Sequence, residues 1–122
     1  MAASQKRVLI VEDEKPLAHA LDLKLQHEGF STVVAQNGQE CLYLLEQSEF
    51  DIVLLDLMMP VIDGFQVLEK LKAKPQMPTV FVLSNLSQRE DEERVLALGA
   101  KKYFIKSDTP LSVIVDEVKK AY

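Results

Sequence analysis

The sequence predicts a doubly wound α/β fold, in which helices cover both faces of a five-stranded parallel sheet. Short apolar runs alternate with helical patterns five times along the 122 residues, and three of the runs are continuously apolar. A strand without a polar face is typical of a parallel sheet that is covered on both sides. The expected strands are residues 8–11, 32–35, 52–55, 80–83 and 103–105.

A helical pattern follows each apolar run. Leu17, Leu21 and Leu25 repeat every four residues, as the buried stripe of a first helix would. Gly99 is placed to end the fourth helix in a left-handed conformation. Polar residues and one proline predict where the other helices begin: Asn37 with Glu40, Asp63, Ser87 with Glu90, and Thr109 as the N-cap with Pro110 as the first residue.

The order of these elements predicts how the sheet is assembled. A (βα)5 chain of this length implies right-handed crossovers and the strand order 2-1-3-4-5, the flavodoxin-like arrangement. Such sheets bind ligands outside the carboxyl ends of their strands, where the winding direction switches. Here that point lies between the first and third strands.

Composition limits the class of protein. A hydrophobic fraction of 48% can build one core, so we expect residues 1–122 to form a single domain. The formal charge of −5 disfavours direct binding of nucleic acid. No apolar run approaches the roughly 20 residues of a membrane helix, and residues 1–7 carry no apolar signal segment. With a lone cysteine, Cys41, these features predict a cytoplasmic protein without membrane contact.

Polar residues gather at the expected carboxyl ends of the strands. Glu12 and Asp13 follow the first strand, Asp56 the third, Ser84 the fourth and Lys106 the fifth. A single Asp after a strand is usually a turn former or a cap. Five polar groups at one end of the sheet instead predict a crevice in which three carboxylates face a hydroxyl and an ammonium group.

Such a crevice predicts a particular chemistry. Crowded carboxylates raise one another's pKa unless a cation lies between them. An all-oxygen site with few protein ligands suits Mg2+, which keeps several waters and readily shares a phosphate, although Ca2+ or Mn2+ could substitute. One carboxylate could then attack phosphorus and form an acyl phosphate, while Ser84 and Lys106 hold the phosphoryl oxygens.

The same residues resemble the response-regulator receiver family of two-component signalling, the CheY-like domains, over about residues 6–121. The family pattern begins with an acidic pair after the first strand and an Asp-x-x-x-Pro segment after the third. It continues with a hydroxyl after the fourth strand, and then a Gly-Ala step, an aromatic residue and a Lys. The matching segments are Val11-Glu12-Asp13, Asp56-Leu57-Met58-Met59-Pro60 with Asp63-Gly64, Ser84, Gly99-Ala100, Tyr103 and Lys106.

The resemblance implies a metal and phosphoryl site. Asp56 would be the phosphoacceptor and, like Asp13, a ligand of Mg2+. Glu12 would help through water, and the backbone carbonyl of Met58 would be a third metal contact. Lys106 would contact the phosphoryl group.

The resemblance also implies a switch and its partners. Ser84 and Tyr103 would be the switch pair, with Tyr103 turning inward once Ser84 meets the phosphoryl group. The phosphoryl donor would be a phosphohistidine on a histidine kinase or a histidine phosphotransfer protein, and small acyl phosphates often substitute. The signal would leave through the fourth helix, fifth strand and fifth helix, to a downstream protein or an output domain outside this chain. The protein would mediate only its own phosphoryl transfer and dephosphorylation, and would not be an enzyme.

Three positions depart from the family pattern. Ser107 stands where Pro usually follows the Lys, in a bond that is commonly cis. A cis bond costs about 0.5–1 kcal/mol before Pro but roughly 2.5–4 kcal/mol before another residue, so we predict a trans bond with Lys106 still near Asp56. Asn85 and Leu86 stand where small residues are usual, which predicts restricted water access and a long-lived phosphoaspartate.

The sequence also bears on four alternatives: a phosphatase, an interaction module that is never phosphorylated, a phosphorelay histidine and a nucleotide-binding fold. A haloacid-dehalogenase-type phosphatase needs a second Asp two residues after its nucleophile, where this chain has Met58. A receiver-shaped interaction module that is never phosphorylated usually lacks one of the chemical residues, and all are present here. His19 or His27 could serve a phosphorelay, but both lie in the first helical pattern, away from the strand ends. The four glycines form no phosphate-cradling loop.

Overall fold

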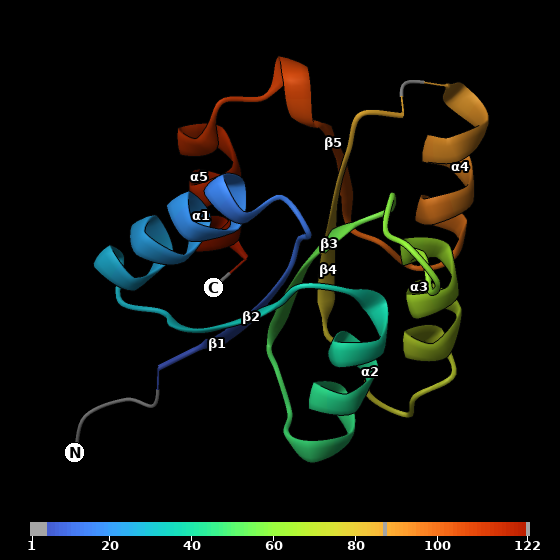
Figure 1. Ribbon diagram of the computed structural model, residues 1–122, viewed down its shortest axis with the longest axis horizontal. Helices are drawn as coiled ribbons and strands as arrows, with labels where there is room; N and C mark the ends of the chain where they lie inside the picture. The colour runs from blue at the N-terminus through green and yellow to red at the C-terminus, as the bar shows by residue number, and fades with distance from the viewer. Residues whose placement is uncertain (1–4, 87, 122) are drawn as a thin grey trace.

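Strands and helices alternate along the whole computed structural model, which describes residues 5–86 and 88–121 (Figure 1). The strands and helices, in chain order, are β1 (Arg7–Val11), α1 (Lys15–His27), β2 (Ser31–Ala35), α2 (Gly38–Gln47), β3 (Ile52–Asp56), α3 (Gly64–Lys72), β4 (Thr79–Ser84), α4 (Arg89–Ala97), β5 (Lys102–Ile105) and α5 (Leu111–Lys120). A short 3-10 turn, η1 (Lys106–Asp108), connects β5 to the segment before α5. Each predicted strand is confirmed to within one residue at either end.

The five strands form one parallel sheet in the order β2-β1-β3-β4-β5, as predicted. The central strand of the switch point, β1, pairs with β2 on one side and β3 on the other. Val11, its last residue, lies opposite both Ala35 and Leu55. The residues that follow β1 therefore emerge beside the carboxyl end of β3.

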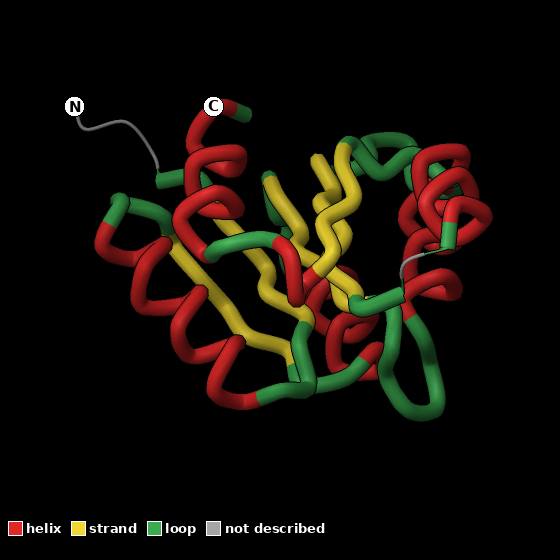
Figure 2. The backbone as a smooth tube through the Cα atoms, turned by 90° about the horizontal axis from the view of Figure 1, so that it is seen from above, coloured by secondary structure: helices red, strands yellow, loops and turns green. Residues whose placement is uncertain are grey.

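Helices cover both faces of the sheet. In Figures 1 and 2, α1 and α5 lie on one face, and α2, α3 and α4 lie on the other. Alternate residues of each strand enter the two cores, because successive side chains of a strand point to opposite faces. In β1, Val8 and Ile10 pack with Leu21 of α1, whereas Leu9 and Val11 belong to the other cluster. Burial of each such side chain stabilises the fold by about 1.5–3 kcal/mol.

Most of the predicted helix boundaries are confirmed. Asn37 caps α2, because its side chain accepts a hydrogen bond from the Glu40 backbone N–H at 2.7 Å. Asp63 caps α3 and exchanges reciprocal hydrogen bonds with Gln66, which makes a full capping box. Gly99 (φ 103°) follows α4 in the left-handed conformation that was predicted to end that helix.

One predicted helix start was wrong, and another falls on a residue that the structure does not describe. The start of α5 was predicted one residue too early, because Pro110 (φ −62°, ψ 148°) is extended and caps the helix. Proline fixes φ at a value common to helical and extended backbone, so its ψ is decided by the chain around it. Thr109, the predicted cap, is itself extended, as the residue before a proline usually is. Ser87, the predicted cap of α4, lies outside the described residues.

The length and hydropathy of the described helices decide whether any of them could span a membrane. Within residues 5–86 and 88–121, no helix is both long enough and apolar enough to span a bilayer.

Candidate functional site

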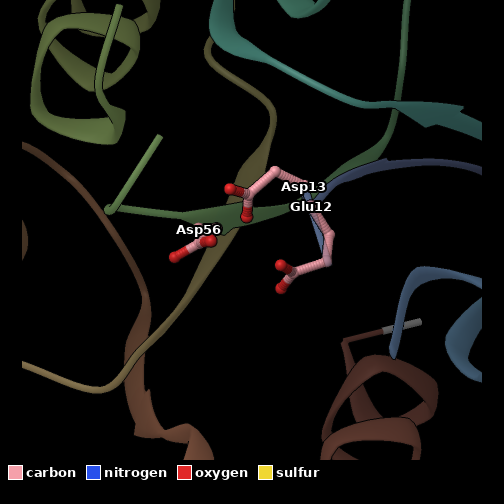
Figure 3. A group of neighbouring side chains, drawn as sticks. All are labelled: Glu12, Asp13 and Asp56. Carbon is pink, nitrogen blue, oxygen red and sulfur yellow. The ribbon is translucent and has the colours of Figure 1, made fainter. Parts of the chain in front are cut away.

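The carboxyl ends of β1 and β3 bring three acidic residues together. The backbone N–H of Glu12 donates to the Ala35 carbonyl at 3.0 Å, which continues the ladder past the end of β1 and fixes where Glu12 and Asp13 emerge. Asp56 is the last residue of β3. Figure 3 shows the three carboxylates gathered around one point, and one oxygen from each lies within 4.8 Å of the others.

These carboxylates differ in their exposure. Glu12 is 1% exposed and Asp56 is 2% exposed, whereas Asp13 is exposed to solvent. Uncompensated burial of an ionised carboxylate is costly, so Glu12 and Asp56 require a nearby positive charge. Asp13 faces the solvent side of the cluster, where a hydrated cation would arrive.

Lys106, the first residue of η1 directly after β5, supplies that positive charge. Its side chain is 11% exposed, and Nζ lies 2.8 Å from Glu12 Oε1 and 3.2 Å from Asp56 Oδ2. A third carboxylate, that of Glu14, lies 2.7 Å from the same nitrogen. One ammonium group therefore bridges two acidic side chains of the β1–α1 loop and one at the end of β3.

The crowding and burial shift the pKa values of these groups. Burial, with a smaller contribution from the charge of Asp56, raises the pKa of Glu12 to about 7. Burial also raises the pKa of Asp56 above its usual range, although Lys106 and a backbone N–H oppose it. Burial would lower the pKa of Lys106, but its close contacts with Glu12 and Glu14 and the charges of Asp56 and Glu12 outweigh it and raise that pKa.

The site has the donor set of a hard divalent cation. Glu12 Oε1 is buried and has no hydrogen-bond partner, since its contact with Lys106 Nζ is an ion pair outside hydrogen-bond geometry. Three carboxylates with one unsatisfied buried oxygen suit Mg2+, whose ligands in proteins are oxygen atoms. Asp13 and Asp56 offer the remaining side-chain oxygens.

The loop after β3 orients the Asp56 carboxylate through a backbone hydrogen bond. The Met58 backbone N–H donates to Asp56 Oδ1 at 3.1 Å, while Met58 itself is 58% exposed. Val61 adopts φ 67°, and the Ile62 N–H donates to the Pro60 carbonyl across it at 2.8 Å. This tight turn is a strained conformation for a β-branched residue. Such strain persists where the surrounding structure enforces it, as it does beside functional sites.

Gly64 explains how α3 can begin so close to Asp56. A Cβ atom at this position would lie 2.5 Å from the Asp56 carbonyl oxygen and 2.7 Å from the Leu57 Cα. No side chain fits there without a backbone shift. The first turn of α3 is therefore pressed directly against the end of β3.

The predicted switch pair lies on the β4–β5 side of the site. Ser84 is fully buried, and its Oγ accepts a hydrogen bond from the Leu86 N–H at 3.1 Å. The Tyr103 hydroxyl donates to the Leu86 carbonyl, and its ring packs against the core cluster beneath α4. The expectation that Tyr103 turns inward on phosphorylation stays a prediction, and the structure places its half-buried ring next to the segment that holds Ser84.

Two further expectations bear on Lys106. No peptide bond is cis among the described residues, so Lys106–Ser107 is trans as predicted, and Lys106 still reaches Asp56. The contact with Glu14 was missed by the sequence analysis. An exposed Glu directly after an acidic pair carries no signal of its own, and its partner lies 92 residues away.

Comparison with known proteins decides the family. The sequence matches the family described as "Response regulator receiver domain" over residues 8–118, which is most of its length. The chain belongs to this family. Receiver domains are typically phosphorylation-dependent switches, so this one is a signalling module and not a catalytic enzyme, which removes the phosphatase alternative. Membership also implies a cognate histidine kinase.

Solved structures agree with this assignment. The signal receiver domain of a signal transduction histidine kinase from Syntrophus aciditrophicus is 31% identical, with a TM-score of 0.84 over 94% of this chain and 88% of that one. Response regulator TrrA from Thermotoga maritima, in complex with Mg2+ and BeF, is 30% identical, with a TM-score of 0.84 over 97% and 100%. The receiver domain of Francisella response regulator 1452 is 28% identical, with a TM-score of 0.88 over 95% of both chains.

Proposed function

We propose that this receiver domain accepts a phosphoryl group on Asp56 from a phosphohistidine on a histidine kinase or a histidine phosphotransfer protein. One observation carries the proposal: Lys106 Nζ lies 3.2 Å from Asp56 Oδ2, beside a cluster of three carboxylates that contains the buried nucleophile. That arrangement pairs a carboxylate nucleophile with a cation that can neutralise charge on the transferred group.

Each neighbouring residue has a role in this proposal. Asp13 and Asp56 would hold Mg2+ directly, the Met58 backbone carbonyl would be a third contact, and Glu12 would act through water. When bound, Mg2+ would neutralise charge on the phosphoryl oxygens. The likeness to TrrA, whose structure contains Mg2+ and BeF, supports this assignment. The Met58 N–H keeps Asp56 Oδ1 oriented, so that the other carboxylate oxygen is placed beside Lys106.

The phosphorylated state would be read on the side of the molecule formed by α4, β5 and α5. The Ser84 hydroxyl would leave the Leu86 N–H for a phosphoryl oxygen, which alters the segment that also accepts the Tyr103 hydroxyl. Phosphorylation adds about −1.5 to −2 units of charge and three acceptor oxygens. A downstream protein, or an output domain outside this chain, would then distinguish two populations of the α4–β5–α5 face.

The proposal extends to the whole chain and its location. We propose residues 1–122 as one receiver domain with a core of about residues 6–121, supported by the match over residues 8–118 and by a single sheet. We also place it in the cytoplasm, without nucleic-acid or membrane binding of its own. The net charge of −5 and the single free cysteine, Cys41, support that placement.

Intact-mass analysis tests the central step. Incubation with a phosphoryl donor and Mg2+ should add one phosphoryl group to the protein and none to Asp56→Asn. Asp51→Asn is the matched control, because Asp51 precedes the amino end of the same strand, and it should be labelled like the wild type. Labelling that persists in Asp56→Asn, or no labelling of the wild type by any donor, would contradict the proposal.

The output face has its own test. Beryllofluoride mimics the phosphoryl group, and its amide shifts should concentrate in α4, β5 and α5, including Arg89, Lys101 and Lys102. Shifts confined to α1 and α2 would refute this face.

A further inference from the structure

A hollow opens to solvent beside Lys106, between the start of α1, the segment after β4 and the turn after β5. Its volume is about 340 Å³, and it is lined by Glu14, Pro16, Leu17, Asn85, Lys106 and Ser107. Because Asp56 is only 2% exposed, a donor must approach it from the solvent side of the site. This hollow reaches Lys106 from that side, so it can receive the part of the donor that leaves after transfer.

Among the residues that line this hollow, Glu14 accepts a hydrogen bond from Lys106. An ammonium group has three donors, and Glu12, Glu14 and Asp56 already contact it. Of the three, Glu14 and Asp56 accept hydrogen bonds and Glu12 forms an ion pair, so a phosphoryl oxygen that binds this nitrogen competes with these carboxylates. Glu14, whose side chain is 57% exposed, is displaced most easily because water can solvate it. Glu14 is then free at the point where the leaving group departs.

We propose that Glu14 is a specificity-determining residue that favours donors with a nitrogen leaving group, such as phosphohistidine or phosphoramidate, over acyl phosphates. This inference rests on the proposed function of Asp56. It deepens that function, because it names the chemical class of donor and assigns the preference to one side chain.

The bonds made and broken explain the preference. An Asp56 carboxylate oxygen forms the new O–P bond as the P–N bond of the donor breaks, and the electron pair of that bond stays on nitrogen. A protonated nitrogen donor thereby leaves as a neutral amine or imidazole. With an acyl phosphate the P–O bond breaks instead, and the leaving group departs as a carboxylate anion.

The charge of Glu14 acts oppositely on these two donors. It attracts the cationic nitrogen of the first donor before transfer and repels the anion released by the second. Two unit charges about 4 Å apart in bulk water already change a rate or binding constant by about fivefold, and partial burial strengthens the effect. The ratio of the two rates should therefore respond to Glu14 more than either rate alone.

Measurement of that ratio is the test. Rate constants for labelling of Asp56 by phosphoramidate and by acetyl phosphate are compared in the wild type, Glu14→Gln and Glu14→Asp. Glu14→Gln should shift the ratio towards acetyl phosphate by about fivefold or more, and Glu14→Asp should retain most of the wild-type preference. Glu46→Gln, which removes the same charge from an exposed position on α2, should leave the ratio unchanged.

A binding measurement complements the kinetics. Imidazole, the leaving group of phosphohistidine, is titrated into the beryllofluoride-bound protein, and it should shift the amides of Asn85 and Ser107 in the wild type. Acetate should not shift them, and the imidazole response should weaken in Glu14→Gln.

The outcomes distinguish this inference from the function on which it rests. Equal changes for both donors in Glu14→Gln would overturn the role of Glu14 while leaving Asp56 as the phosphoacceptor. A ratio shift of the same size in Glu46→Gln would also overturn it, because the effect would then come from net charge. No labelling of the wild type by either donor would overturn both.

Discussion

The two ends of the sheet both carry charged side chains, but they use them differently. Near the amino ends, Asp51 Oδ2 accepts the Arg7 backbone N–H at 2.8 Å, and the Asp51 N–H donates to the Arg7 carbonyl at 2.9 Å. The Arg7 guanidinium donates to the Glu49 carbonyl and lies 4.6 Å from the centroid of the Phe50 ring. Arg7 and Asp51 therefore each have fixed partners within the protein.

At the carboxyl ends, the charges outnumber their partners. Glu12, Asp56 and Glu14 share the single ammonium of Lys106, and Glu12 Oε1 has no hydrogen bond at all. Local interactions there are left incompletely satisfied, which is expected where a ligand completes the site. The number of charged residues therefore does not distinguish the functional end from the structural one, but the balance of partners does.

The largest expected difference between the two ends of the sheet is the effect of a substitution on Mg2+ affinity. Asp13→Asn removes a proposed direct ligand and should weaken Mg2+ binding more than Glu12→Gln, which should cost roughly 10–100-fold as an indirect contact. Isothermal calorimetry with Mg2+ measures both. Asp51→Asn, at the opposite end of the sheet, should bind as the wild type does. Equal affinities in the Asp13 and Glu12 variants would contradict the ranking.

The pH dependence of stability should differ between the two ends. Because the folded-state pKa of Glu12 is raised to about 7, the folded chain holds this proton more tightly than the unfolded chain. Its contribution to stability is complete below pH 4.5 and is lost as the pH rises through 7. In EDTA, urea unfolding between pH 4.5 and 7.5 should show a loss of about 1–3 kcal/mol in the wild type that is absent in Glu12→Gln. The same slope in both proteins would argue against burial of an ionisable Glu12.

The amino end should respond to the loss of a matched partner. Asp51→Ala leaves the partly buried Arg7 N–H without its side-chain acceptor and should lower the free energy of unfolding by about 1–2 kcal/mol. Asp51→Asn retains an acceptor oxygen and should lose less. Urea unfolding in EDTA measures both variants, and equal losses would show that charge, rather than the hydrogen bond, matters there.

The smallest effect is expected at an exposed pair away from both ends. Arg89 and Glu93 of α4 form an i,i+4 contact with side chains 89% and 68% exposed. Glu93→Gln should change the free energy of unfolding by no more than about 0.5 kcal/mol. A larger loss in urea unfolding would mean that α4 depends on this contact for its docking.

Sequence reasoning recovered what depends on local pattern. The three fully apolar runs became the central strands β1, β3 and β4, because only a strand covered on both faces needs no polar side. The polar residues that followed them became the site, because all strands of a parallel sheet end at the same edge. The sequence alone therefore predicts that Glu12, Asp13, Asp56 and Lys106 lie together, as they do in the structure.

What it missed depends on contacts between distant segments. Glu14 is an exposed glutamate whose partner, Lys106, lies 92 residues away in the sequence. Pro110 could begin a helix or precede one, and only its ψ of 148° in the folded chain distinguishes the two. The Tyr103 hydroxyl donates to the Leu86 carbonyl, a contact that no pattern of hydrophobic residues reveals.

The backbone of Leu86 links the two residues of the predicted switch pair. Its N–H donates to Ser84 Oγ, and its carbonyl accepts the Tyr103 hydroxyl. Because backbone groups carry both contacts, the side chain at position 86 can vary without loss of the link. The tolerance to substitution should therefore be high at position 86 and low at the hydroxyl of Tyr103.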